Sequence, residues 1–281
     1  MRPHDLHVHT PLSGCGVVTA TALRAAASSA PSEGVPSGLL LRELTKLVVL
    51  EYFDAARGRG LEVLGFTDHW TPWTSPDTFD WLRAAISELP KPGGLQVYVA
   101  AEVDVLSSDG RLAAPERELA RLDYVLAAPH HYHLSYVEQP PCDLEGLLEH
   151  AMRELEAVIR SLLVDAVAHP WAEVVGYARE RCGLSVALAD IPEEYLWRTC
   201  ELAERRWKAL QVQYDPGWER EGHPMRGTLR FLRIAAESGC PLFFGSDAHR
   251  PADLARGLEH TLRALGRLGV RPDRLWLPER A

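Results

Sequence analysis

Seven short apolar runs, alternating with segments of helical period, constrain the fold of this 281-residue chain more than any other feature. The runs cover residues 5–8, 62–66, 95–101, 123–128, 164–168, 209–212 and 241–244. Each has the length of a buried parallel strand. Parallel strands joined by right-handed helical crossovers close most easily as a barrel, so we expect an α/β fold of the barrel class. An open, doubly wound sheet is the alternative.

Two of the intervening segments show the helical period clearly. Apolar side chains recur at helical spacing over residues 40–55, where Ser37 is a candidate N-cap and Gly60 a candidate stop, and again over residues 144–158. His150 and His260 fall in helical segments without a motif around them, and we expect both to be surface residues.

Groups of metal-ligating residues lie at the downstream ends of most of the runs. They are His7-Val8-His9, Asp68-His69, Glu102, His130-His131, His169, Asp247 and His249. In a barrel these strand ends meet at one face, where the chemistry of such folds is located. Imidazole and carboxylate ligands together suit several Zn, Mn or Fe ions, and strand alternation puts His7 and His9 on one face. The pattern therefore predicts a multinuclear metal hydrolase.

Composition restricts the remaining choices. The formal net charge of -9 argues against binding of long nucleic acids, because proteins contact phosphate backbones through clustered Lys and Arg. The five cysteines are odd in number and widely spaced, which argues for a reducing compartment and against a disulfide framework. No apolar run is long enough to span a membrane, so we expect a cytoplasmic protein without membrane contact.

The domain organisation is expected to be simple. Residues 1–281 are 46% hydrophobic, enough for one core, and we predict one domain over the whole length. Residues 20–38 are rich in Ala, Ser, Pro and Gly and form an insertion, either a flap over the site or a disordered surface segment.

The ordered motifs resemble those of one family. They are Asp5-Leu6-His7-Val8-His9-Thr10, Gly65-Phe66-Thr67-Asp68-His69, Ala101-Glu102, the 123–130 segment ending in Pro129-His130, Ala168-His169-Pro170 and Gly245-Ser246-Asp247-Ala248-His249. Together they are similar to the motifs of the PHP (polymerase and histidinol phosphatase) family. The resemblance implies a distorted (β/α)7 TIM-like barrel, two or three divalent metal ions (Mn, Zn or Fe) at the carboxyl ends of its strands, and hydrolysis of a small phosphate monoester like histidinol phosphate.

The resemblance also assigns ligands to each metal ion. The first ion would be held by His7, His9 and Asp247, and Glu102 would bridge it to a second ion held by His130 and His169. A third would be held by His69 and His249, with Cys15 at the position of a further His in many relatives. Thiolate favours Zn or Fe(II) over Mn, and a packing role for Cys15 is equally open.

A bridged metal pair predicts the mechanism. Such a pair would supply a hydroxide for attack on phosphorus, and Glu102, Asp247 and His249 would be the catalytic residues. Asp68 is expected to support a neighbouring ligand. Substrate-contact candidates are Arg250, Arg226, His131 and His223, and Trp70, Trp73, Trp171 and Trp218 are candidates for flat pocket walls.

Two alternative activities stay open. One is an amidohydrolase-type hydrolase of lactones or amides, although Lys46, Lys91 and Lys208 all lie away from strand ends where a metal-bridging lysine would be needed. The other is a phosphodiesterase of nucleotides or short oligonucleotides. Gln211-Val212-Gln213 replaces the Glu-x-Asn pattern of the family, which puts histidinol phosphate itself in doubt.

Overall fold

The computed structural model of the protein describes residues 2–15 and 37–279. Its strands form a seven-stranded sheet in the order β1-β2-β3-β4-β5-β6-β7. The strands are β1 (His4–Val8), β2 (Val63–Trp70), β3 (Gln96–Asp104), β4 (Val125–Ala128), β5 (Ala166–Val167), β6 (Ala209–Val212) and β7 (Leu242–Phe244). The pairs β1 with β2, β4 with β5, β5 with β6 and β6 with β7 are parallel. A sheet whose spatial order follows the sequence order has no switch point, so the barrel topology is confirmed over the doubly wound alternative.

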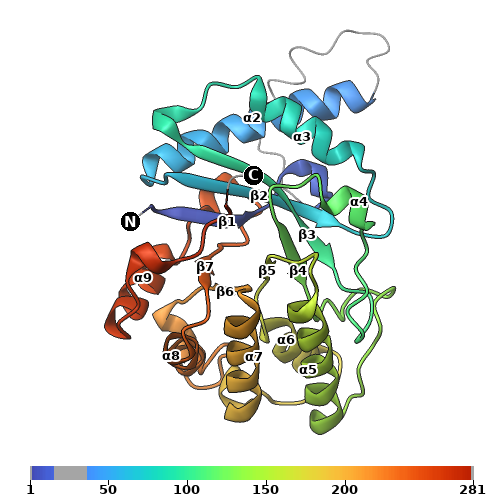
Figure 1. Cartoon of the computed structure of the whole chain (residues 1–281), viewed down its shortest axis with the longest axis vertical. Helices are drawn as coiled ribbons and strands as arrows, with labels where there is room; N and C mark the ends of the chain where they lie inside the picture. The colour runs from blue at the N-terminus through green and yellow to red at the C-terminus, as the bar shows by residue number, and fades with distance from the viewer. Residues whose placement is uncertain (1, 16–36, 280–281) are drawn as a thin grey trace. The chain divides into compact units, whose positions relative to one another are not determined.

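Helices connect the strands, as Figure 1 shows. They are α2 (Ser37–Gly58), α3 (Asp77–Ser87), α4 (Glu116–Leu119), α5 (Leu144–Arg160), α6 (Ala172–Glu180), α7 (Glu193–Arg206), α8 (Thr228–Ser238) and α9 (Leu258–Arg267). Both helices expected from the apolar spacing are present. In α5 the N-cap is Asp143, whose carboxylate accepts a hydrogen bond from Gly146 N at 2.8 Å.

The described chain forms two compact units. We call Arg2–Ala101 with Gly245–Arg256 the amino-terminal unit, and Glu102–Phe244 with the segment from Gly257 onward the carboxyl-terminal unit. In Figure 1, α2 and α3 lie beside β1 and β2. The helices α5 to α8 lie side by side next to β4 to β7. The prediction of a single domain over residues 1–281 stays a prediction. Most of the insertion expected at 20–38 lies outside the described residues.

The strand boundaries differ from the expected ones at two functionally important places. β2 continues to Trp70 and so contains Asp68 and His69, and β3 continues to Asp104 and so contains Glu102. These polar side chains are buried or nearly buried, so they interrupt the apolar run without ending the strand. A run of apolar residues therefore underestimates a strand that ends inside a polar site.

The expected surface position of His150 was wrong. Its side chain is 3% exposed and lies edge-on to Tyr132, with ring centroids 5.6 Å apart. His150 follows Leu147 by three residues and precedes Glu154 by four, and both are buried. It therefore shares the buried face of α5.

The expectation of no disulfide was also wrong. Cys142, just before α5, and Cys182, just after α6, form a disulfide with Cα atoms 5.1 Å apart. The two cysteines are separated by 40 residues, and only the packing of α5 against α6 brings them together. Cys15, Cys200 and Cys240 are free thiols.

Candidate metal centre

The first cluster lies in the amino-terminal unit and joins β1 to the turn after β7. His7, in β1, and His9, directly after β1, are fully buried and two residues apart along an extended chain, so their rings lie on the same face. Their Nε2 atoms are 3.0 Å apart, and they lie 3.4 and 3.0 Å from Asp247 Oδ1. Two imidazole nitrogens and a carboxylate oxygen directed at one point form a donor set that fits a divalent cation.

A buried carboxylate holds the turn that carries Asp247. Asp5 accepts hydrogen bonds from Ser246 N at 2.8 Å, from the Ser246 hydroxyl at 2.5 Å and from Ala255 N at 2.8 Å. Burial raises the pKa of Asp5, and the hydrogen bonds from Ser246, Ala255 and His7 act in the opposite direction. The sequence analysis assigned no role to Asp5. The available signal was its position two residues before His7, on the same strand face.

Two further side chains fix the chain around His9. Thr10 N and the Thr10 hydroxyl donate to the two oxygens of Asp68, at 2.5 and 2.6 Å. Tyr52, on α2, donates to His9 O at 3.0 Å. Both oxygens of Asp68 are therefore engaged with Thr10, an arrangement that fits the supporting role predicted for it.

The second cluster, also in the amino-terminal unit, is made of His9, Cys15, His69 and His249. One ligand atom from each lies within 4.8 Å of the others. The His9 ring stacks on His249 with centroids 4.4 Å apart and lies 4.5 Å from His69. Partial burial raises the pKa of the Cys15 thiol, but hydrogen bonds to His249, His69 and His9 outweigh it and bring this pKa to about 3. The cluster thus offers a thiolate and three imidazoles.

The third cluster belongs to the carboxyl-terminal unit. Glu102, near the end of β3, lies with Oε1 2.9 Å from His169 Nε2 and 3.8 Å from His131 Nε2. His169 has a positive φ of 25°, and its backbone N–H donates to Gln211 Oε1 at 3.0 Å. Gln211, which departs from the family pattern, therefore holds the backbone of a predicted ligand.

His130 is placed apart from this cluster. Its Nε2 lies 3.1 Å from Ala151 O, and its backbone N–H donates to Glu154 Oε2 at 3.2 Å, so both contacts go to α5. Burial lowers the pKa of His130 to about 3. The predicted ligand role of His130 is untested by this arrangement and stays a prediction.

The predicted substrate contacts have partners within the protein. Arg250 pairs with Asp253 at 2.7 Å, and Arg226 lies 3.6 Å from Asp190. The His223 ring stacks with Trp218, their centroids being 6.3 Å apart. All three residues lie in segments that follow strand ends, and their contact with substrate stays a prediction.

Two of the four tryptophans proposed as pocket walls pack in the interior. Trp70 is 3% exposed and stacks on Phe79, with centroids 4.8 Å apart. Trp171 is fully buried and donates from Nε1 to Thr199 at 3.2 Å. A tryptophan that follows a strand end is therefore as easily a packing residue as a wall.

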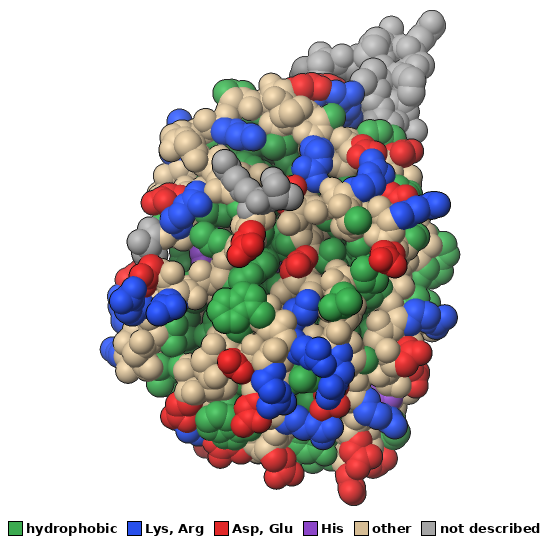
Figure 2. All heavy atoms as spheres, in the orientation of Figure 1, with side chains coloured by type: hydrophobic (Ala, Val, Ile, Leu, Met, Phe, Trp, Pro, Cys, Tyr) green, Lys and Arg blue, Asp and Glu red, His purple; other side chains and the backbone are tan. Residues whose placement is uncertain are grey.

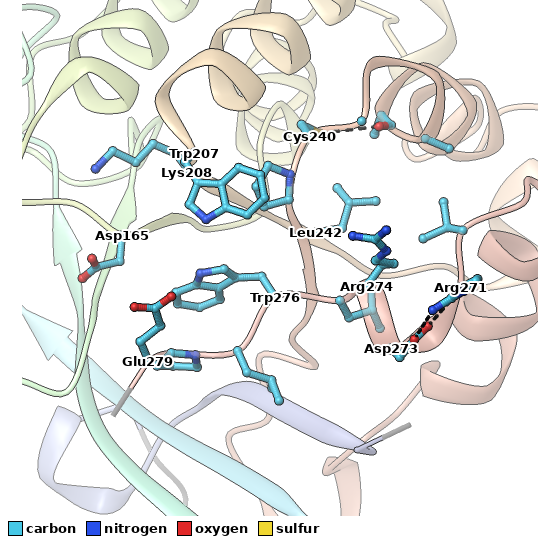
Figure 3. A pocket seen from close by; sticks show the side chains of 18 of the residues that line it. Asp165, Trp207, Lys208, Cys240, Leu242, Arg271, Asp273, Arg274, Trp276 and Glu279 are labelled. Atoms are coloured by element: carbon cyan, nitrogen blue, oxygen red, sulfur yellow. Dashed lines mark hydrogen bonds and ion pairs between the residues drawn. The ribbon is translucent and has the colours of Figure 1, made fainter. Parts of the chain in front are cut away.

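A cavity of about 820 Å³ lies at the amino-terminal ends of the strands of the carboxyl-terminal unit. It is lined by residues that precede β4, β5, β6 and β7 and by residues of the segment 268–279, and Figure 3 shows Trp207 and Trp276 among them with the Arg271–Asp273 ion pair nearby. Lys208, another lining residue, is bound through Nζ to Val164 O. The cavity is therefore separate from the third cluster, whose residues lie at the carboxyl ends of the strands.

Surface charge is mixed. On the face shown in Figure 2, Lys and Arg side chains are interspersed with Asp and Glu. Among residues 2–15 and 37–279, no helix is long and apolar enough to cross a lipid bilayer.

Comparison with known proteins identifies similar sequences. No family model matches the chain. A protein named "Probable phosphatase" from Caldicellulosiruptor bescii is 23% identical over 222 residues, which is 79% of each chain. A "Probable histidinol-phosphatase" from Deinococcus radiodurans is 24% identical and aligns over 95% of this chain and 94% of its own.

One solved structure has the same fold. The histidinol phosphate phosphatase of Lactococcus lactis, solved with Zn, L-histidinol and phosphate, matches with a TM-score of 0.59 at 14% identity, over 96% of this chain and 95% of its own. This similarity confirms the TIM-like (β/α)7 fold class. By sequence the chain is similar to proteins named as probable phosphatases, and by fold it is similar to a histidinol phosphate phosphatase.

Proposed function

We propose that the protein is a metal-dependent phosphoesterase that hydrolyses a small phosphate monoester. The observation that carries this proposal is the meeting of His7, His9 and Asp247, whose ligand atoms lie 3.0 to 3.4 Å apart. The phosphatase names of the relatives support the reaction class, and an anionic ester suits a site whose charge is supplied by cations.

The clusters would hold two or three divalent ions. Such ions lower the pKa of bound water toward neutrality and neutralise charge on phosphate oxygens. The chain's own residues would then orient these groups. Asp5 holds the Asp247 turn, and Gln211 holds the backbone of His169. The bridging role of Glu102 stays a prediction.

His249 of the second cluster, or the nearby Asp247, would protonate the leaving group. Hydrogen bonding to Cys15, which outweighs burial, raises the pKa of His249, and Asp247 acts in the same direction. A protonated imidazole can give its proton to a departing alkoxide. Arg250 and Arg226 are proposed to contact the phosphate, since guanidinium pairs with phosphate oxygens through two hydrogen bonds.

The donor set favours particular metals. Thiolate is a good ligand for Zn and Fe(II) and a poor one for Mn, so we propose Zn or Fe(II) at the cluster that contains Cys15. The first and third clusters contain only nitrogen and oxygen donors, which suit Mn as well.

The test is hydrolysis of phosphomonoesters, phosphodiesters and lactones, each assayed with Mn, Zn and Fe(II) in turn. We expect the largest kcat/KM for a small phosphomonoester. Preferential lactone hydrolysis would instead support an amidohydrolase-type reaction. Two of the three lysines have other partners, because Lys46 pairs with Glu43 and Lys208 is bound to Val164 O.

The expected setting of the protein also stays a prediction. A small phosphorylated substrate, no long nucleic acid and no membrane remain the expected partners. The Cys142–Cys182 disulfide argues against the cytoplasm, because cytosolic thiols are mostly kept reduced. Differential alkylation of thiols in intact cells, before and after reduction, would show which compartment the protein occupies.

A further inference from the structure

The two adjacent histidines after β4 have different surroundings. His130 has a φ of 73°, the left-handed region, and this turn of the backbone sends the two rings to different neighbours. The His130 ring lies between Tyr132 and Trp171, at centroid distances of 5.6 and 5.9 Å. The His131 ring stacks on His169, with centroids 5.4 Å apart.

The Nε2 atom and the backbone N–H of His130 make structural contacts, whereas its Nδ1 is buried without a hydrogen bond. Its ring and its backbone N–H bind Ala151 and Glu154 of α5. Glu154 also accepts a hydrogen bond from the Tyr132 hydroxyl at 2.7 Å. These contacts fix the start of the loop after β4 against α5.

The contacts of His131 are those of a metal ligand. Its Nδ1 lies 2.8 Å from Asp104 Oδ1, and the Tyr136 hydroxyl donates to the other Asp104 oxygen. Metal-binding imidazoles commonly donate one ring nitrogen to a carboxylate, which directs the other nitrogen at the metal. Both His131 and Asp104 are buried, so the pair is held in a fixed orientation.

The distances around Glu102 permit a shared ion. Two ligand atoms that each lie about 2.1 Å from one ion are at most about 4.2 Å apart. Glu102 Oε1 lies 3.8 Å from His131 Nε2 and 2.9 Å from His169 Nε2, both inside this limit. The carboxylate that lies near His130 Nε2 is instead that of Glu154 on α5, at 3.9 Å.

We infer that His131, and not His130, completes the metal site of Glu102 and His169, and that Asp104 and Tyr136 are the positioning residues of this ligand. This inference rests on the proposed function, because it assumes that the third cluster binds a divalent ion. It gives His131 the ligand role that the family resemblance gives to His130.

The test measures metal content and stability of the full chain. Wild type and the variants His131→Gln, His130→Gln and His133→Gln are purified after growth with Zn, Mn and Fe, and metals per chain are measured by elemental analysis. His133, exposed in the same loop, is the control. We expect His131→Gln to lose about one ion per chain. We expect His130→Gln to keep its ions with a lowered Tm, and His133→Gln to match wild type.

Asp104→Asn provides an arm that leaves both histidines in place. We expect this variant to weaken metal binding about 10- to 100-fold in a competition with a chelator, as loss of an orienting carboxylate does. This arm also decides the question if His130→Gln does not fold.

The outcomes separate this inference from the proposed function. Full metal content in His131→Gln, or loss of an ion in His130→Gln with an unchanged Tm, would overturn the assignment alone. Unchanged chelator competition in Asp104→Asn would also overturn it. Wild type that holds less than one ion per chain would overturn the proposed function, and the assignment with it.

Discussion

At the scale of single residues, most functional side chains are held by a carboxylate or an amide outside the ligand set. Asp5 binds the turn of Asp247, Asp68 binds Thr10 beside His9, and Gln211 binds His169. The candidate ligand residues could be proposed from the sequence because strand alternation fixes their spacing. Their supporting partners were not, since a contact such as that of Gln211 with His169 depends on which strands become neighbours.

Glu102→Gln is expected to reduce kcat by roughly a thousandfold or more while the fold is kept, because an amide cannot supply the charge of a metal-binding carboxylate. The measurement is kcat together with circular dichroism. Glu180→Gln, exposed on α6, is the control. Activity within tenfold of wild type would remove Glu102 from the catalytic residues.

Cys15→Ser is expected to weaken binding of one ion and to lower kcat with little change in KM, because the thiolate of the second cluster is lost. Cys15→His should keep or raise Mn-dependent activity. Metal content and kinetics of both variants are compared with those of Ser13→Ala, which alters the neighbouring hydroxyl. A Cys15→Ser variant with full metal content and wild-type kcat would show that the thiol only packs in the turn.

Glu154→Gln tests a buried carboxyl shared by Tyr132 and His130. Burial raises the pKa of Glu154 to about 8, against the hydrogen bonds from Tyr132 and His130. The folded state therefore holds this proton more tightly than the unfolded state, so the stabilisation is complete below pH 4.5 and is lost as the pH rises through about 8. His130 and His150 adjoin Tyr132, and burial lowers the pKa of each.

We expect the Tm of wild type to fall between pH 5 and 8 more steeply than that of Glu154→Gln, as measured by thermal denaturation across that range. Equal slopes for the two proteins would mean that Glu154 is already ionised in the folded state.

At the scale of elements, the strands were predictable to within a few residues because buried parallel strands are continuous apolar runs. The burial of His150 was not predictable, since a lone polar residue in a helix does not indicate whether it lies on the buried face or the exposed face. The Cys142–Cys182 disulfide could not be predicted from the sequence for a related reason. Its formation depends on the packing of α5 against α6, and two cysteines 40 residues apart do not encode that packing.

The disulfide closes a chain segment that includes all of α5 and α6. A double variant, Cys142→Ser with Cys182→Ser, is expected to be less stable by roughly 2–4 kcal/mol, because the unfolded chain regains conformational freedom. Urea denaturation of the oxidised wild type and of the variant measures the difference. Cys200→Ser, a buried free thiol, is the comparison for cysteine loss without cross-link loss. Equal midpoints for the wild type and the double variant would indicate that the segment is ordered without the bond.

At the scale of the whole molecule, the fold class followed from the count and order of the apolar runs, and the histidinol phosphate phosphatase of Lactococcus lactis shares it. The division into two compact units did not follow. Composition shows no break near residue 101, because the boundary falls inside β3 and not in a linker.

Removal of metal is expected to lower the Tm of the whole protein. An ion at about 100 times its Kd stabilises a folded protein by roughly 2.7 kcal/mol, and several ions add further stabilisation. Dialysis against a chelator followed by calorimetry measures the loss, and readdition of Zn should restore the Tm. A Tm unaffected by the chelator, in protein shown to be metal-free, would mean that the clusters are preformed by their own hydrogen bonds.

The contact between Asp5 and Ser246 has a consequence for biosynthesis. A ribosome releases Asp5, His7 and His9 at the beginning of translation, but Ser246, which donates a hydrogen bond to Asp5, is 241 residues later. Until then the nascent chain carries a strand with a carboxylate and two imidazoles that lack their final partners. Assembly of the first cluster is thus tied to the end of synthesis, and a chain interrupted before residue 245 cannot bring these side chains together, however well its earlier helices have folded.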